Sequence, residues 1–387
     1  TGVSALATLA GIDEFSGTPA PMTIPAELLQ ALAVVTDETG APLANDKSIK
    51  DLVWTGNRLA FTIEMGYPAA SRHPAIREAL QQAARALPGV EQVDVQITTK
   101  VVPHAVQSGI QLIKGVKNVV AVASGKGGVG KSTTAANLAL ALAAEGAKVG
   151  LLDADIYGPS MPMMMGVQGK PESLDGKSME PMIGHGVRVM SIGFLIDGDQ
   201  AMIWRGPMAS QALDQLLHQT HWGTAPDDEL DYLVVDMPPG TGDIQLSLSQ
   251  RVPVTGAVMV TTPQDIALLD VKKGINMFQK VGVPILGVVE NMAVHVCSNC
   301  GHQEHIFGRE GGKRLAEAQG MPYLGALPLS LSIREQADSG APTVVSDPDS
   351  QAAQTYREIA RKVAASIAAK GRDYTHKFPT IKVSHGT

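Results

Sequence analysis

The stretch Ser124-Gly-Lys-Gly-Gly-Val-Gly-Lys-Ser-Thr133 decides the fold of this chain. It follows the apolar run Val119 to Ala123, which predicts a buried strand, and it leads into the helical pattern Ser132 to Ala144. The pattern G-x-x-x-x-G-K-[ST] between a strand and a helix is typical of a phosphate-binding loop. The alternative is a glycine-rich turn that binds no nucleotide.

The residue types in this stretch suit phosphate binding. Glycines let successive backbone N–H groups turn inward around phosphate oxygens, and the N-terminus of the following helix adds its dipole. Lys131 is expected at the β- and γ-phosphates, Ser132 at Mg²⁺ and Thr133 at the α-phosphate. The predicted nucleotide-binding residues of the loop are Gly125, Lys126, Gly127, Gly128, Val129, Gly130, Lys131, Ser132 and Thr133.

Short apolar runs without alternation recur on both sides of the loop, with helical segments between them. The runs are Val119 to Ala123, Val149 to Leu152, Leu233 to Val235, Ala257 to Val260 and Ile285 to Val289. Buried strands that alternate with helices predict a mostly parallel sheet covered by helices on both faces. The predicted fold class is therefore α/β, a P-loop nucleotide hydrolase.

Acidic residues end two of these strands. Asp153 and Asp155 follow Val149 to Leu152, which places them at the carboxyl edge of the sheet, where ligands bind in open α/β folds. Asp236 ends the run Leu233 to Val235 in the Walker B pattern, which holds Mg²⁺, usually through water. Any one of these acids alone is equally typical of a helix cap or a surface charge.

The chain before the loop predicts a second, smaller unit. Residues 22–103 show the order helix, strand, strand, helix, strand, which is typical of a small α+β domain. Residues 104–117 are expected to form a linker with one helical turn, and residues 118–370 the nucleotide-binding domain. Residues 1–21 are interpreted as a disordered tail or an expression remnant, and residues 371–387 as a flexible tail.

Composition excludes several classes of protein. The net charge is −7, so the overall basic charge of a nucleic-acid-binding protein is absent. No stretch approaches the roughly 18 consecutive apolar residues that cross a bilayer. The chain has two cysteines, Cys297 and Cys300, which cannot form the disulfide framework of a secreted protein. They indicate one local site in a reducing compartment, and we expect a cytoplasmic protein.

The pair Cys297-Ser-Asn-Cys300 has the spacing of a metal site. Thiolates suit Zn²⁺ or iron–sulfur clusters, but one pair supplies only two of the usual four ligands. Either His302 and His305 complete a compact site, or a second chain supplies two more thiolates across a two-fold axis. The close histidine spacing favours the intersubunit arrangement. A redox-active dithiol and a pair of inert buried cysteines are the remaining alternatives.

Over about residues 22 to 370 the chain resembles the Mrp/ApbC family of P-loop iron–sulfur cluster carriers, which is related to the MinD/ParA ATPases. The resemblance rests on the loop and on six further segments. These are Asp153 to Ser160, Trp204 to Met208, Asp236 to Asp243, Thr261 to Gln264, Glu290 to Met292 and Cys297 to Gly308. The first domain is similar to the iron–sulfur assembly accessory module of bacterial members. It departs from some relatives because no cysteine follows Tyr67-Pro68.

The resemblance implies roles for individual residues in ATP binding and hydrolysis. Lys126 would reach across a dimer to the partner's phosphates, with a solvated lysine as the alternative, and Asp155 would position the attacking water. Gly240, in the loop Pro238 to Asp243, would sense the γ-phosphate with its amide, and Asn291 would read the adenine edge. Lys126, Lys131 and Asp155 are thus the predicted catalytic residues.

The resemblance also implies a function. A homodimer would bind a [4Fe–4S] cluster between its subunits through Cys297 and Cys300, with zinc possible in its place. It would pass the cluster to apo-proteins, with scaffold proteins as further partners, and would need neither nucleic acid nor membrane. The alternatives are a MinD/ParA-like spatial regulator and a structural zinc dimer with an ATPase switch. A nitrogenase-type reductase and a small-molecule kinase fit the motifs less well.

Overall fold

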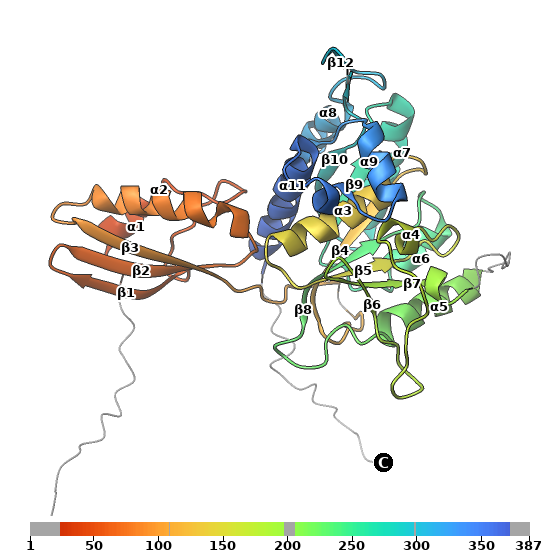
Figure 1. Cartoon of the computed structure of the whole chain (residues 1–387), viewed down its shortest axis with the longest axis horizontal. Coiled ribbons are helices and arrows are strands. Elements are labelled where there is room, and N and C mark those ends of the chain that lie inside the picture. Colours follow the sequence, from red (N-terminus) through yellow and green to blue (C-terminus); the bar gives the residue numbers. More distant parts are fainter. Residues whose placement is uncertain (1–23, 108, 197–205, 298, 372–387) are drawn as a thin grey trace, which may run out of the picture.

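The computed structural model describes residues 24–107, 109–196, 206–297 and 299–371, and it divides into two domains (Figure 1). The predicted tails lie outside the described residues, apart from Gly371, and so do Trp204 and Arg205. Within the described ranges no helix is long and apolar enough to cross a membrane.

The first domain has the predicted order of elements. Its helices are α1 (Ala26–Leu32) and α2 (His73–Arg85), and its strands are β1 (Ile49–Thr55), β2 (Arg58–Met65) and β3 (Gln92–Thr99). The strands form a sheet in the order β1-β2-β3, antiparallel at the first pair and parallel at the second. The alternating residues Leu59, Phe61 and Ile63 are almost fully buried.

An eight-stranded sheet forms the centre of the second domain, in the order β13-β10-β9-β4-β8-β5-β7-β6. Its strands are β4 (Val116–Ser124), β5 (Val149–Asp153), β6 (Met182–Gly184), β7 (Val187–Ser191), β8 (Leu230–Asp236), β9 (Gly256–Thr261), β10 (Ile285–Glu290) and β13 (Tyr323–Ala326). The predicted parallel sheet is confirmed, since every neighbouring pair is parallel except β6 with β7.

Helices cover both faces of this sheet (Figure 1). On one face α3 packs against α11, and on the other lie α5, α6 and α7. The helices are α3 (Lys131–Ala144), α4 (Met161–Met164), α5 (Gly206–His218), α6 (Asp243–Ser249), α7 (Asp265–Lys280), α8 (Gly311–Ala318), α9 (Leu331–Asp338), α10 (Thr343–Ser346) and α11 (Gln351–Ala368). Ile359, Val363 and Ile367 bury the apolar face of α11 completely.

The linker differs from its prediction. Strand β4 begins at Val116, two residues before the predicted start of the domain, and the described part of residues 104–117 contains no helical turn. The reason is a buried anchor. The backbone N–H of His104 donates to the side-chain oxygen of Asn118, and the amide of Asn118 donates to the carbonyl of Val102. These bonds attach the first residues of the linker to the start of β4.

A buried charged network joins the two domains. Arg361 of α11 donates to Glu145, at the C-terminal end of α3, over 2.8 Å and to Glu38 of the first domain over 2.9 Å. Ser71 donates to both carboxylate oxygens of Glu145 through its backbone N–H and its hydroxyl. The helix that follows the phosphate loop is therefore attached at its far end to the first domain.

Candidate functional site

The predicted phosphate loop forms the turn between β4 and α3. Gly128 and Gly130 have φ values of +80° and +79°, in the left-handed region that favours glycine, and Gly130 caps α3. The loop lines a cavity of about 280 Å³ together with Lys126, Asp155 and Pro239. The structure thus brings the loop, the predicted water-positioning acid and the switch loop around one space.

Close packing behind the loop fixes its path. A Cβ atom at Gly125 would overlap the backbone of Asp270 and Val271 in α7, and one at Gly130 would overlap the amide nitrogen of Asn291. Space therefore requires glycine at both positions, and at Gly130 the left-handed φ requires it as well. A larger cavity of about 530 Å³ lies at the domain junction, between Tyr67 and Lys370, and contains none of the predicted site residues.

The side chain of Lys131 is paired with Asp236 in this structure, so it is not free to bind phosphate. Its Nζ lies 2.6 Å from Oδ1 of Asp236 and 3.2 Å from the hydroxyl of Ser132. The lysine side chain is 6% exposed and the aspartate fully buried. A buried charge without a partner is costly, so the two predicted ligands of the nucleotide and of Mg²⁺ satisfy one another. Nucleotide binding therefore requires Lys131 to change partners.

The other oxygen of Asp236 fits the predicted metal role. Oδ2 is buried and has no hydrogen-bond partner among the described residues. Buried polar atoms in native proteins are nearly always satisfied, so an orphaned carboxylate oxygen beside a phosphate loop indicates a missing cation or its water. With the hydroxyl of Ser132 close to the same lysine, the donor set is one of oxygens, which Mg²⁺ prefers.

Asp153 proves to be the organiser of the loop that carries Asp155, a role that the sequence did not reveal. Its Oδ2 accepts hydrogen bonds from the backbone N–H groups of Ser160 and Met161 and from the hydroxyl of Ser191, at 2.9 to 3.1 Å. Its Oδ1 accepts from the N–H of Asp155 at 3.2 Å. Burial, and then the charge of Asp236, raise the pKa of Asp153 to about 7. The only feature of the sequence that pointed to Asp153 was its position at the end of a predicted strand.

Asp155 itself lies half-buried in the wall of the cavity. Burial raises the pKa of its carboxyl group, and the positive charge of Lys131 opposes that shift. The acid is thus close enough to the loop for its charge to interact with the phosphate-binding lysine. Its predicted task, positioning the attacking water, stays a prediction.

The switch loop Pro238 to Asp243 contacts the end of β4. The N–H of Gly240, a residue with φ +104°, donates to the carbonyl of Ser124 at 3.2 Å. The amide predicted to sense the γ-phosphate is therefore bound within the protein here. Sensing a phosphate through this N–H would require the loop to leave Ser124.

Asn291 and Lys126 occupy opposite sides of the loop. Asn291, at the end of β10, is 9% exposed and donates its amide N–H to the carbonyl of Val129 at 2.8 Å. Its predicted contact with adenine stays a prediction, and that amide nitrogen is already engaged. Lys126 is half-buried and lines the cavity of its own chain, so its predicted reach across a dimer also stays a prediction.

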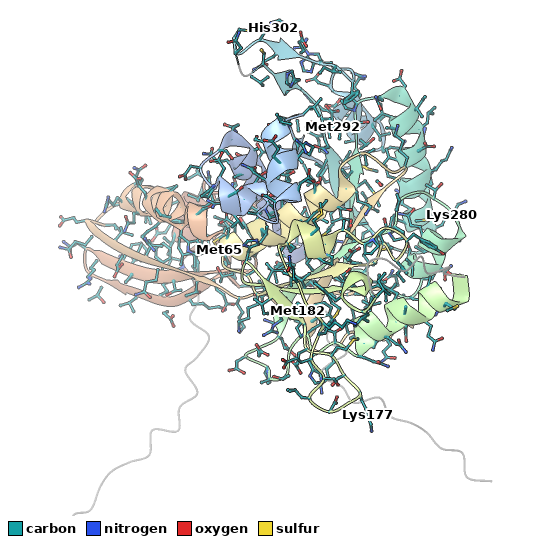
Figure 2. All side chains as sticks on the ribbon, turned by 45° about the vertical axis from the view of Figure 1, so that its right-hand side comes forward. Met65, Lys177, Met182, Lys280, Met292 and His302 are labelled. Carbon is teal, nitrogen blue, oxygen red and sulfur yellow. The ribbon has the colours of Figure 1, made fainter. Side chains whose placement is uncertain are left out.

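The cysteine pair lies on a projecting hairpin formed by β11 (His295–Val296) and β12 (Gln303–Glu304). Figure 2 shows His302 at its outer end and Met292 at its base. Cys297 is half-buried and Cys300 exposed. The N–H of Cys297 donates to the carbonyl of His302, and that of Gly301 to the carbonyl of Cys297, both at 2.9 Å. Hydrogen bonds from the backbone N–H groups of Cys300 and Asn299 lower the pKa of the Cys297 thiol.

His302 and His305 are not gathered around the cysteine pair in this structure. Nδ1 of His305 lies 2.8 Å from the carbonyl oxygen of Ala293 at the base of the hairpin, and His302 is exposed at its end. Within the described ranges, no three His, Cys, Asp or Glu side chains gather closely enough to hold a metal ion. The predicted arrangement in which a second chain supplies two more thiolates stays a prediction.

The sequence reasoning also missed the network around Glu145 at the far end of α3. An acidic residue at a helix C-terminus is unfavourable next to the helix dipole, and this was the one local signal that a cation would be found there. Its partner Arg361 lies 216 residues later in the chain, so the pair itself could not be foreseen.

Two family models match the chain, one in each domain. The model described as "NUBPL iron-transfer P-loop NTPase" matches residues 115–364, and the model described as "Iron-sulfur cluster assembly protein" matches residues 25–96. These boundaries agree with the division between the small α+β domain and the domain of the eight-stranded sheet.

Curated relatives match most of the chain. The iron-sulfur cluster carrier protein of Pseudomonas fragi is 59% identical over 283 residues, which are 73% of this chain and 97% of that one. The carrier protein of Escherichia coli K12 is 52% identical over 326 residues, 84% of this chain and 87% of that one.

Among solved structures, the nucleotide-binding protein of Archaeoglobus fulgidus in complex with ADP is 38% identical. It has a TM-score of 0.52 and covers 58% of this chain and 87% of its own. The match of the first family model to well over half of the residues, together with the high identity of the relatives, shows that this chain belongs to the NUBPL iron-transfer P-loop NTPase family.

Proposed function

We propose that this protein is an ATP-dependent iron–sulfur cluster carrier whose cargo, a [4Fe–4S] cluster, is held between two copies of the chain. The observation that carries the proposal is the projecting hairpin with two reduced thiols and no further ligand grouped around them within the described residues. Two thiolates from each of two chains complete the four ligands of such a cluster. Relatives named iron-sulfur cluster carriers support the same cargo.

The dimer is supported by apolar side chains exposed beside the phosphate loop. Ile266 and Leu269 of α7 are 69% and 64% exposed, and the same helix packs against Gly125. Ile306, just after the hairpin, is 55% exposed. Exposed apolar patches of this kind mark interaction sites, and a second copy of the chain is the partner that the cluster requires.

In the proposed cycle, nucleotide phosphates take Lys131 away from Asp236, which becomes free to hold Mg²⁺ through water together with Ser132. Asp155 positions the attacking water, and Lys126 reaches the partner's phosphates. The N–H of Gly240 leaves Ser124 for the γ-phosphate, so the switch loop moves with the state of the nucleotide. Hydrolysis then resets these contacts and changes the exposure of the cluster to apo-protein clients. The thiols must stay reduced, which fits a cytoplasmic location.

The spatial-regulator alternative finds less support. A regulator that binds membrane through its last helix needs an amphipathic helix free to lie on the bilayer. In α11 the apolar residues Ile359, Val363 and Ile367 are fully buried against the rest of the domain. This helix serves the fold of the domain.

Anaerobic reconstitution with iron and sulfide tests the proposal, followed by metal and sulfide analysis, absorption spectroscopy and measurement of the mass in solution. Wild type should bind about four iron and four sulfide per pair of chains. Cys297→Ser should bind almost none, while His302→Ala, a change at an exposed neighbour on the same hairpin, should bind as much as wild type. A single tightly held zinc per pair of chains and no cluster would favour the structural zinc dimer.

A further inference from the structure

Three consecutive residues connect the phosphate loop to the cysteine hairpin. Asn291 donates its amide N–H to the carbonyl of Val129 in the loop at 2.8 Å. Two residues later, the carbonyl oxygen of Ala293 lies 2.8 Å from Nδ1 of His305, across the base of the hairpin. Met292, between them, is labelled in Figure 2 where the hairpin leaves the body of the domain.

Asn291 binds the carbonyl side of the peptide between Val129 and Gly130, and the N–H side of this peptide belongs to Gly130, which lines the nucleotide cavity. The carbonyl of Val129 and the N–H of Gly130 belong to one planar trans peptide, in which they point in opposite directions. Gly130 lines the phosphate cavity. A phosphate that accepts from the Gly130 N–H therefore orients the same rigid unit that Asn291 holds from behind, and the two hydrogen bonds polarise one another.

The hairpin segment has an unusual backbone at both ends. Met292 and Glu310 have φ values of +57° and +52°, and residues 293–309 between them include both cysteines. A residue other than glycine in this region costs on the order of 1 kcal/mol, and the surrounding contacts must maintain it. At the second end, Glu290 accepts a hydrogen bond from the N–H of Gly312, at the start of α8. Glu290, the last residue of β10, and Asn291, the residue after it, thus lie at the two ends of the segment.

Building on the cluster-carrier function proposed above, we propose that Asn291 is a positioning residue that couples occupancy of the phosphate loop to the position of the cysteine hairpin. Met292 and Glu310 are the two points about which the hairpin turns. When nucleotide occupies the phosphate loop, its phosphate fixes the orientation of the Val129–Gly130 peptide. The hydrogen bond from Asn291 to this peptide then restricts the backbone at Met292. The base of the hairpin becomes more rigid as a result. An empty loop leaves the hairpin freer.

Hydrogen exchange measured by mass spectrometry on the full chain without a cluster tests the coupling, with and without Mg²⁺ and a non-hydrolysable ATP analogue. In wild type, the analogue should slow exchange of the Cys297 and Gly301 amides at least about threefold. In Asn291→Ala at saturating analogue, α3 should still become protected, whereas the hairpin response should be lost.

Asn118→Ala is the matched control. Asn118 is also buried, and its amide donates to the carbonyls of Val102 and Asp231 at the opposite end of β4. This variant should lose stability but keep the hairpin response. A hairpin response of wild-type size in Asn291→Ala, or no response in wild type, overturns the proposal.

If Asn291→Ala no longer binds the analogue, Met292→Gly tests the coupling instead. Glycine adopts the same φ without strain and leaves the Asn291 amide in place, so affinity should stay within about twofold while the hairpin response weakens. An unchanged response in this variant overturns the proposal. The protein carries no cluster in these measurements. A negative result here would therefore contradict the coupling but not the proposed cluster binding. A failure to load a cluster would contradict cluster binding but not the coupling.

Discussion

Lys131 and Asp236 form an ion pair inside the nucleotide site, with Nζ 2.6 Å from Oδ1 and both side chains almost fully buried. In this ion pair, Asp236 occupies the position of the phosphate that Lys131 is expected to bind. Lys131 likewise occupies the position of the Mg²⁺ that Asp236 is expected to bind. Releasing only one of them would leave a buried charge unpaired, which is unfavourable. We therefore expect nucleotide and Mg²⁺ to favour each other's binding at this site.

Lys131→Ala should abolish nucleotide binding and lower the free energy of unfolding by about 3 kcal/mol, because Asp236 is left buried without a partner. The double variant Lys131→Ala/Asp236→Asn should recover part of that stability but no nucleotide binding. Urea unfolding and titration with a fluorescent ATP analogue measure the two effects. If Lys131→Ala were as stable as wild type, the pair would contribute nothing to the fold.

Asp153 should give the fold a specific pH dependence, because burial and the charge of Asp236 raise its pKa from 3.8 to about 7. A carboxyl group with a higher pKa in the folded chain stabilises the fold at low pH, and this contribution is lost as the pH rises through the folded pKa. Between about pH 5 and 7 the unfolding free energy of wild type should fall relative to that of Asp153→Asn. The relative slope should be at most about 1.4 kcal/mol per pH unit.

Urea unfolding of both proteins at several pH values measures this slope. The absolute stability of Asp153→Asn is not the test, because its amide also replaces an oxygen that accepts hydrogen bonds from Ser160, Met161 and Ser191. A difference between the two proteins that stayed constant with pH would show that Asp153 does not titrate in this range.

Gly130→Ala should disrupt the loop, since its φ of +79° disfavours a side chain and its Cβ would overlap the amide of Asn291. We expect a loss of about 2 kcal/mol in unfolding free energy and of nucleotide binding. Gly127→Ala is the matched stability control, because nothing lies within 4 Å of a Cβ there. Thermal unfolding of the two variants checks the difference, and equal melting temperatures would contradict the close packing seen at Gly130.

Arg361→Ala should loosen the contact between the domains, because Glu145 and Glu38 lose their cation and Glu145 is 2% exposed. The expected cost is about 3 kcal/mol, with faster proteolysis in the linker. Arg334→Ala is the control, since its ion pairs with Glu335 and Asp338 are exposed and should contribute about 0.5 kcal/mol or less. Equal cleavage rates in the two variants would show that the network does not hold the domains together.

The sequence was sufficient to predict those features that depend only on neighbouring residues. The phosphate loop, the acids Asp155 and Asp236 at strand ends, and the domain order follow from spacing and apolar periodicity, which short segments already carry. The strands β6, β7 and β13 were missed, and all three are short, with β6 only three residues long. The helical turn predicted for the linker is absent from its described part, and the anchoring of its first residues by Asn118 joins positions too far apart for local spacing to reveal.

The state of the site could not be read from sequence. The pairing of Lys131 with Asp236, the bond from Gly240 to Ser124 and the bond from Asn291 to Val129 each join segments far apart in the chain. Motifs identify which groups serve a ligand, but they do not say what these groups bind in its absence. That depends on distances between side chains after folding.

The last helix has a consequence for the order in which the protein is made. Domains generally fold as units during synthesis, and Leu59, Phe61 and Ile63 of the first domain are almost fully buried. Its docking, however, needs Arg361 from α11, and Ala368 of the same helix packs against Gly66. The contacts of Arg361 that join the two domains can therefore form only after α11 has been synthesised.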